Sequence, residues 1–296
     1  MQCMRRLGIV IVTAMVTLMG CSSQLGYRFA DTFIAWQVDD YVTLNSTQDD
    51  LLMGEIKTLH YWHATSELPR YRNSLLMLRD AIATQTFDET TFANLTQDAW
   101  YFWDRVREQT LPLALQHLPK LTPGQVDELT NNMQVKIDER AERRAERLAE
   151  MTPDERVTEQ RDELEGDVRE WIGRLSAKQR GIVADWVAAQ QANGELWLAY
   201  RQAWLDEFKA VLKAGPQSAD YTTRIETLIR HPQTFESPEL TEIRAANSKV
   251  NQTYTLIMYQ TLSERQRARV LEQLDDYLAD LDDIIAEFEG RDKPEN

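Results

Sequence analysis

The sequence predicts an all-α protein, a multi-helix bundle of long amphipathic helices behind a lipoprotein signal peptide. Apolar residues recur every three or four positions over most of the chain, which is the period of one helix face. Alternating strand patterns are absent from the sequence. The few prolines, including that of the Gly215-Pro216 pair, stand mostly between the apolar stripes, where helices are expected to end.

The first element is an export signal over residues 1–20. Arg5 and Arg6 precede an uncharged apolar stretch, and a small residue stands directly before Cys21. A basic start, a short apolar run and a small residue at the cleavage point are typical of secreted proteins, and the cysteine makes the segment resemble a bacterial lipoprotein signal. We therefore expect the mature chain to begin at a lipid-bearing Cys21, with residues 21–27 as a tether.

The apolar run at residues 7–20 is too short to cross a hydrocarbon core of about 30 Å, since a helix rises about 1.5 Å per residue. An uncleaved membrane helix, or an ordinary signal with a chance cysteine, is the alternative interpretation. Ser22 follows the cysteine, and in the lipoproteins that this segment resembles, a residue other than aspartate there implies sorting to the outer membrane. Several acyl chains would hold the body there, because each buried CH₂ contributes about 0.8 kcal/mol.

Four apolar stripes define the helices of the body, which is expected over residues 28–289. The stripes are Tyr71, Leu75, Leu78 and Ile82; Val157, Leu164, Val168, Trp171 and Leu175; Trp186, Trp197, Tyr200, Trp204, Phe208 and Val211, expected on one long helix; and Val270, Leu274, Leu278, Leu281, Ile285 and Phe288. Each stripe covers less than half of a helix circumference, as in a bundle. Gly215 followed by Pro216 predicts a helix end, whereas Pro112 is expected to kink a helix rather than end it.

A short pattern marks several helix starts: Leu or Met, a capping residue, and a Gln or Glu three positions after the cap. The cap side chain accepts from the backbone N–H three residues on, and the Gln or Glu side chain returns to the backbone N–H of the cap. The predicted caps are Asn45, Thr122, Thr152, Ser176 and Ser263.

The helical body carries one candidate subdivision, near residue 121.

Residues 138–147 are almost all charged with acids and bases balanced, which predicts a solvated helix face or a protruding helix that meets a partner. Residues 290–296 are expected to form a flexible tail.

Composition excludes several function classes. The formal charge is −15, so the chain repels nucleic acid, and no basic stripe argues otherwise. Cys3 lies inside the signal and Cys21 would carry lipid, so we expect no disulfide, no thiol nucleophile and no Cys-ligated metal in the mature body. No nucleophile elbow, P-loop or dinucleotide-binding turn occurs, and we expect neither an enzyme nor a cofactor.

His60, His63 and Glu67 are the residues with metal-ligand character. On a regular helix they would lie within about 60° of one another, and two imidazoles with a carboxylate can ligate zinc. His63 also falls on an apolar stripe, and no HExxH signature is present. A packed histidine with a satisfied ring N–H is therefore the favoured interpretation, and no metal is expected.

Asp39 and Asp40 follow Trp36 near an expected helix end. Adjacent helical residues point about 100° apart, so the two aspartates cannot act as one paired carboxylate. We expect one of them to pack against Arg70 or Arg72 and the other to meet solvent. The alternative function is a metal-dependent or acid/base enzyme built on His60, His63, Asp39 and Asp40.

Four consecutive aromatic residues, Trp100, Tyr101, Phe102 and Trp103, cover both sides of one predicted helix. Core burial on two faces is the expectation. The alternative is an exposed aromatic groove for apolar chains or peptide helices.

The segment at residues 27–71 contains short groups of aromatic and charged residues. The groups are Trp36 with Asp39, Asp40 and Tyr41; Leu44 with Gln48; Trp62 with His63; and Glu67, Leu68, Pro69, Arg70 and Tyr71. With these groups the mature chain resembles an uncharacterised family of predicted Gram-negative lipoproteins with a domain of unknown function, although Ala64 stands where a basic residue is expected. The resemblance implies a lipid anchor, an α-helical body and no assigned chemistry. The candidate binding residues are Trp36, Asp39, Asp40, Tyr41, His60, Trp62, His63, Glu67, Arg70 and Tyr71.

The capping pattern also resembles the Leu-Thr/Ser-x-x-Gln motif of the Spy/CpxP-type periplasmic chaperones, small helical proteins that bind unfolded or stress-related clients. The match covers a few five-residue windows of a longer and more acidic chain, and capping by itself explains the motif.

From these observations we expect a periplasm-facing lipoprotein of the outer membrane with a non-enzymatic binding or envelope-maintenance role. Its partners would be the membrane, through the lipid on Cys21, and a polypeptide or envelope-protein client, or a lipid, in a groove between amphipathic helices. A purely structural lipoprotein with one fixed partner is a further alternative.

Overall fold

The structure is a computed structural model that describes residues 23–294, so the predicted signal and Cys21 lie outside the described residues. The first helices are α2 (Ser23–Arg28), α3 (Ala30–Asp39), α4 (Ser46–Trp62), the π-helical turn η1 (His63–Glu67), α5 (Leu68–Ala83), α6 (Glu89–His117), the 3-10 turn η2 (Leu118–Lys120) and α7 (Pro123–Glu150). The remaining helices are α8 (Pro153–Ile172), α9 (Ala177–Ala189), α10 (Gly194–Ala214), α11 (Tyr221–Arg230), the 3-10 turn η3 (Pro232–Phe235), α12 (Pro238–Gln260) and α13 (Glu264–Glu289). The all-α prediction is confirmed, with no strand among residues 23–294. Among the described residues, Ser23 is already helical, so the helices reach into the segment that was expected to be a tether.

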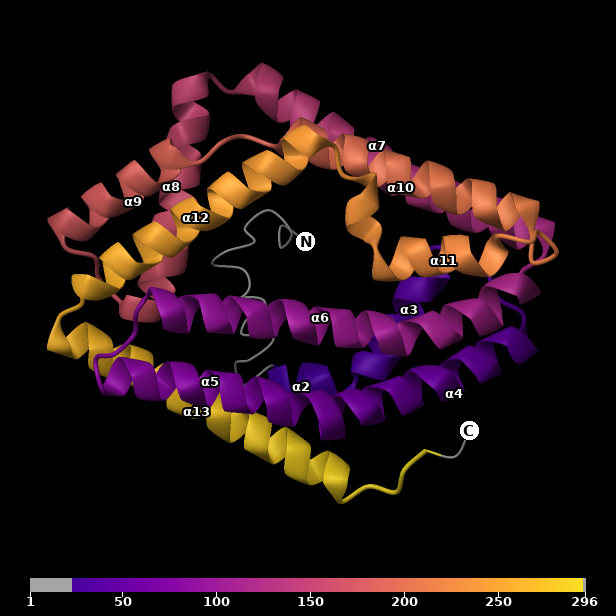
Figure 1. The fold of residues 1–296 in the computed structure, drawn as a ribbon, viewed down its shortest axis with the longest axis horizontal. Coiled ribbons are helices and arrows are strands. Elements are labelled where there is room, and N and C mark those ends of the chain that lie inside the picture. The colour runs from indigo at the N-terminus through magenta and orange to yellow at the C-terminus, as the bar shows by residue number, and fades with distance from the viewer. Residues whose placement is uncertain (1–22, 295–296) are drawn as a thin grey trace.

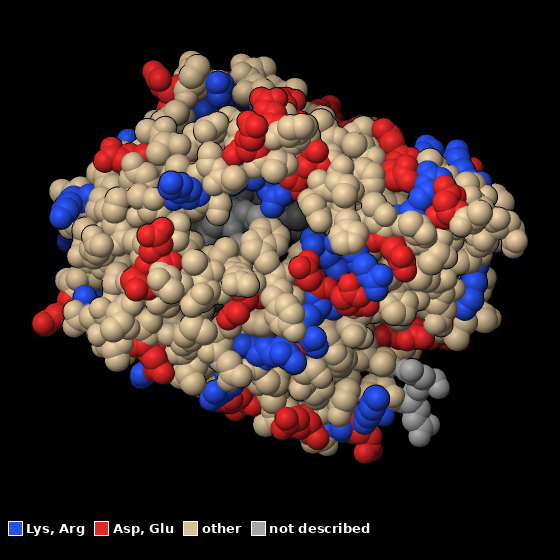
Figure 2. All heavy atoms as spheres, viewed as in Figure 1, with Lys and Arg blue, Asp and Glu red and all other residues tan. Residues whose placement is uncertain are grey.

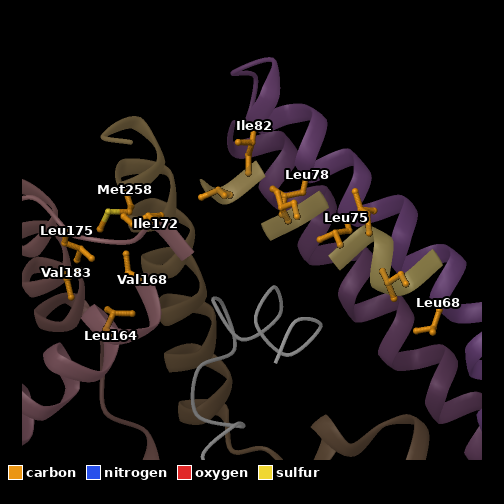
Figure 3. Packing of buried hydrophobic residues seen from close by; sticks show 14 of the residues in the cluster. Leu68, Leu75, Leu78, Ile82, Leu164, Val168, Ile172, Leu175, Val183 and Met258 are labelled. Carbon is orange, nitrogen blue, oxygen red and sulfur yellow. The ribbon is translucent and has the colours of Figure 1, made fainter. Parts of the chain in front are cut away.

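The helices pack around two hydrophobic clusters, and α6 runs along both of them (Figure 1). One hydrophobic cluster joins α5, α8, α9, α12 and α13, and the fully buried Leu274 lies within it. Figure 3 shows part of this cluster, with Leu75 and Leu78 in a row along one side of α5. The other cluster joins α6, α7, α10 and α11 around Val211 and Ile225. Each cluster takes residues from both sides of residue 121, so a cut there would divide both cores.

All the predicted capping boxes are present, at Asn45, Thr122, Thr152, Ser176 and Ser263. Each cap satisfies backbone N–H groups that the first helical turn leaves without partners, and contributes about 1 kcal/mol. These caps explain why α4, α7, α8, α9 and α13 begin where they do.

Four of these caps are joined in pairs through their glutamines. Gln125 Nε2 donates to Gln48 Oε1 at 2.7 Å, which ties the start of α7 to the start of α4. Gln179 and Gln266 donate to each other, both at 3.0 Å, which ties α9 to α13. An amide can do this because it donates as well as accepts, whereas a carboxylate only accepts. The recurrent glutamine therefore serves helix pairing as well as capping; the box of α8 uses Glu155 instead.

Three details of the predicted stripes are corrected. Trp186 lies on α9 and not on the helix of Trp204, because the chain leaves the helix between α9 and α10. Leu175 is buried but follows the end of α8, and Val157 is exposed. Pro112 lies inside α6 as predicted, and α10 ends before Gly215, whose φ of +76° suits a residue without a side chain.

Charged side chains of both signs are interspersed over the face seen in Figure 2. In the highly charged part of α7, Arg144 and Arg147 pair with Glu195 and Glu159. Within residues 23–294, no helix combines the length and the apolar character needed to cross a membrane.

Candidate functional site

A polar cluster forms where η1 interrupts the run from α4 to α5. Pro69 has no N–H to give to the carbonyl of Thr65, and its ring crowds that carbonyl, which accounts for the widened turn just before it. Such π turns re-aim the side chains of a helix and occur frequently at functional sites. Here the turn directs His63 and Glu67 into the protein, each toward its own set of partners.

Both ring nitrogens of His63 face tyrosine hydroxyls. The Nδ1 atom lies 2.8 Å from Tyr27 Oη, and the Nε2 atom lies 3.1 Å from Tyr71 Oη. Burial, and then the nearby His60 ring, lowers the pKa of His63 to about 4, so the imidazole is neutral at pH 7. Burial also raises the pKa of both tyrosines, which stay protonated. A neutral imidazole donates through one nitrogen and accepts through the other, so one tyrosine donates and the other accepts.

Glu67 is fully buried and held by Arg105. Arg105 Nε lies 2.8 Å from Oε1 and 2.9 Å from Oε2, and Arg70 approaches Oε1 at 3.7 Å. The Arg105 guanidinium also lies over the rings of Trp62 and Tyr101. The carboxylate is thus committed to an ion pair, and a metal would have to displace that arginine.

His60 is packed between aromatic rings, with the centroids of Tyr27 and Phe288 each 4.8 Å away. Burial lowers the pKa of His60, and smaller effects come from Asp31, which raises it, and Arg291, which lowers it. Within the part of the chain that the structure describes, no group of three or more His, Cys, Asp or Glu side chains is arranged to hold a metal ion. The predicted spacing of His60, His63 and Glu67 assumed a regular helix, and the π turn changes that spacing.

The structure brings together six of the candidate binding residues and separates the rest. The six around η1 are His60, Trp62, His63, Glu67, Arg70 and Tyr71. Trp36, Asp39, Asp40 and Tyr41 lie at the other end of α4. Tyr27, just before α3, packs on His60 near the end of α4, whereas Asn45, which follows α3, caps the start of α4. The helix α3 therefore runs antiparallel to α4 and in contact with it. The fifteen residues from Asn45 to His60 span about 22 Å.

Asp39 and Asp40 are both exposed. The expectation that one of them pairs with Arg70 or Arg72 is wrong. Arg70 lies beside Glu67, and Arg72 binds Asp282, with Nη2 2.9 Å from Oδ2.

Two members of the cluster were missed in the sequence, namely Tyr27 and Arg105. Arg105 follows the buried Phe102 by three positions, so both residues lie on the same face of α6. A basic residue on a buried helix face indicates a buried acidic partner, and the sequence could have predicted one on this ground. The expected burial of the aromatic run on both faces is also wrong. Phe102 is buried, but Tyr101 and Trp103 are 48% and 53% exposed.

A second feature is an apolar pocket of about 650 Å³ between α3, α4, α6, α7, α10 and α11. We call it the α3 pocket. Its wall includes Ile34 and Val38 of α3, Tyr41, Leu52 of α4, Phe208 of α10 and Ile225 of α11. A smaller pocket of about 180 Å³ lies inside the first hydrophobic cluster. No residue of the cluster around η1 lines either pocket.

The wall of the α3 pocket is nearly all carbon, and several of its polar groups are already bonded. Gln48 Nε2 donates to the Lys120 carbonyl oxygen at 3.0 Å, and Trp204 Nε1 donates to the Leu228 carbonyl oxygen at 2.9 Å. His117 also lines the pocket, and burial and then the nearby Lys120 lower its pKa. The pocket can therefore accept an apolar molecule, but it offers little hydrogen bonding.

These features define the class: an all-α protein with one buried polar cluster of structural character and a carbon-walled pocket. The chain belongs to a family of unknown function, DUF6279, whose model matches residues 40–241. The expected resemblance to a helical family of unknown function is thereby confirmed, whereas the similarity to the Spy/CpxP-type chaperones is not shown. Neither the curated proteins nor the solved structures contain a match to the chain.

Proposed function

We propose that this protein is a lipid-anchored binding protein of the cell envelope that holds an apolar ligand or client in the α3 pocket without chemical turnover. One observation carries the proposal. The α3 pocket falls within the range of about 300–1,000 Å³ that is usual for ligand sites, and its wall is nearly all carbon. Monomeric proteins rarely leave such a surface uncovered unless it binds something.

The location rests on the sequence. The basic, apolar and small-residue pattern at residues 1–20, followed by Cys21, supports a lipid anchor, and Ser22 supports the outer membrane, facing the periplasm. Because the described helices start at Ser23, the α3 pocket would lie close to the bilayer surface.

The enzyme alternative gains no support from the geometry. It requires His60 and His63 to act with Asp39 or Asp40, and these pairs stand at opposite ends of α4. Glu67 is occupied by Arg105, and both His63 nitrogens are occupied by tyrosines.

Binding can be tested with N-phenyl-1-naphthylamine, whose fluorescence rises in apolar surroundings. The full-length chain would be held in an amphipathic polymer and compared with Val38→Asp in the same polymer. Fluorescence from dye that enters the polymer is then the same in both samples and is removed by the comparison. We expect saturable binding to one site that is at least about tenfold weaker in Val38→Asp, since the variant places a charge on the apolar wall. Equal signals from the two proteins would overturn the proposal.

The anchor is tested separately by fractionating cells that express the chain or Cys21→Ser. We expect labelled fatty acid on the first and none on the second, with only the first in the outer membrane. Identical fractionation of the two would contradict the anchor but not the pocket.

A further inference from the structure

The size of the α3 pocket favours a thin ligand. A methylene group takes up about the volume of a water molecule, about 30 Å³, so a sixteen-carbon chain needs about 500 Å³. A single acyl chain therefore fits the 650 Å³ available.

The chemistry of the wall argues against an extended peptide. Each residue of a bound peptide brings an N–H and a carbonyl oxygen, which are costly to bury without partners. On the wall, the Gln48 amide is engaged with Lys120 and Gln125, and the Trp204 N–H is engaged with Leu228. A hydrocarbon chain requires no such partners.

One part of the pocket is polar. The end of α6 and η2 contribute His117 and Lys120 to the wall, and Lys120 is exposed. His117 Nε2 is buried and has no hydrogen-bond partner within the described residues. Glu55, whose charge acts on His117, does not line the pocket and accepts from Gln116 Nε2 at 3.2 Å. An acidic head group would therefore find its positive partner at Lys120.

The pocket is covered on one side by α3. None of the ten residues of α3 is fully buried, although Ile34 and Val38 lie on the pocket wall. Helices with few buried contacts open more readily than core helices, so α3 can admit a ligand without disturbing either hydrophobic cluster.

From these observations we infer that the α3 pocket binds a long-chain fatty acid, with the acyl chain under α3 and the carboxylate beside Lys120 and His117. This inference rests on the proposed function, because it names the ligand class of the same site. No covalent step is involved, and the fatty acid leaves unchanged.

The test uses a palmitate analogue with a photoreactive diazirine in the middle of its chain. The full-length chain in amphipathic polymer is irradiated with the analogue, and the labelled peptides are identified by mass spectrometry. The variants are Val38→Asp and Lys120→Glu, and the matched control is Trp36→Asp, which places the same charge on a residue of α3 that does not line the pocket. Palmitate, methyl palmitate and an amphipathic helical peptide serve as competitors.

We expect labelling on α3, α4, α10 or α11, competed by palmitate, lost at least about tenfold in Val38→Asp and changed less than about twofold in Trp36→Asp. Lys120→Glu should weaken competition by palmitate about fivefold while leaving methyl palmitate unchanged, because only the acid carries a charge. Because Lys120 is exposed, we expect this variant to keep its fold. It then decides the case even where circular dichroism shows Val38→Asp to be unfolded.

Four results would overturn the inference. Labelling outside the α3 pocket, or equal labelling of all the variants, would remove the fatty acid site. Displacement of N-phenyl-1-naphthylamine by the peptide but not by palmitate would replace the fatty acid with a polypeptide and leave the proposed function standing. Absence of both palmitate and naphthylamine binding would overturn the inference and the proposed function together.

Discussion

Changing Gln179 to glutamate tests whether the paired caps hold the helices together. Gln179 is 1% exposed and lies where α9 and α13 begin. Its Oε1 accepts from the Ser176 backbone N–H at 2.9 Å, which a glutamate would still do. Its Nε2 donates to Gln266 Oε1 at 3.0 Å and approaches the Thr261 carbonyl oxygen at 3.4 Å. A carboxylate would turn an oxygen toward both acceptors.

The magnitude follows from these contacts. One well-formed bond is lost, and a carboxylate oxygen then faces the Gln266 and Thr261 oxygens with no hydrogen between them, which costs about 1–3 kcal/mol. Burial of a carboxylate raises the cost further. We expect Gln179→Glu to lower the free energy of unfolding by about 3 kcal/mol. For a chain of this size that loss lowers the melting temperature by about 5 °C.

The assay is thermal and urea unfolding of the full-length chain, followed by circular dichroism at 222 nm. The matched control is Glu155→Gln, the reverse exchange in the exposed cap of α8, where we expect little change in the free energy of unfolding. A loss below about 1 kcal/mol in Gln179→Glu, or equal effects at the two caps, would refute the idea that the glutamine pairs stabilise the fold.

Two further predictions concern the cluster around η1. Arg105→Met should cost about 3 kcal/mol in urea unfolding, because it leaves the fully buried Glu67 carboxylate without its main partner. Arg79→Met, which breaks an exposed pair with Asp275 at 2.9 Å, should cost much less, and equal costs would contradict the burial argument. Burial holds the folded pKa of His63 at about 4, below its ordinary 6.5, so the unfolded chain binds more protons between these values. The His63 contribution is complete above pH 6.5 and is lost toward pH 4 by about 3 kcal/mol, and unfolding of His63→Phe should depend less on pH over this range; an unchanged pH slope would count against it.

The parts of the fold that depend on neighbours in sequence were predictable. A capping box is complete within four residues, so Thr122 and Ser263 predict the starts of α7 and α13 without information from the rest of the chain. The stripe on α13 is equally local, because one helix face must be buried whatever covers it.

What the sequence did not reveal depends on residues far apart. The pairing of Gln179 with Gln266 spans the chain from α9 to α13, and nothing near either residue indicates it. The break between α9 and α10 contains no proline, and the apolar periodicity continues across it, so the sequence predicted one long helix there. The α3 pocket is assembled from six helices, and only their packing leaves the space between them.

The candidate site was recovered in part for the same reason. Residues around His63 are close in sequence and stay close in space, because α4, η1 and α5 follow one another. Trp36 and Asp39 were grouped with them by resemblance, but the direction of α3 along α4 carries both residues away.

Hydrogen exchange of the α3 amides tests most directly whether the α3 pocket is a binding site. Exchange would be followed by mass spectrometry on the full-length chain, with and without saturating N-phenyl-1-naphthylamine. The account predicts that residues 30–39 exchange at least about tenfold more slowly with the ligand, while α13, which does not line the pocket, is unchanged. Exchange in α3 that does not respond to the ligand, or slows equally in α13, would contradict it.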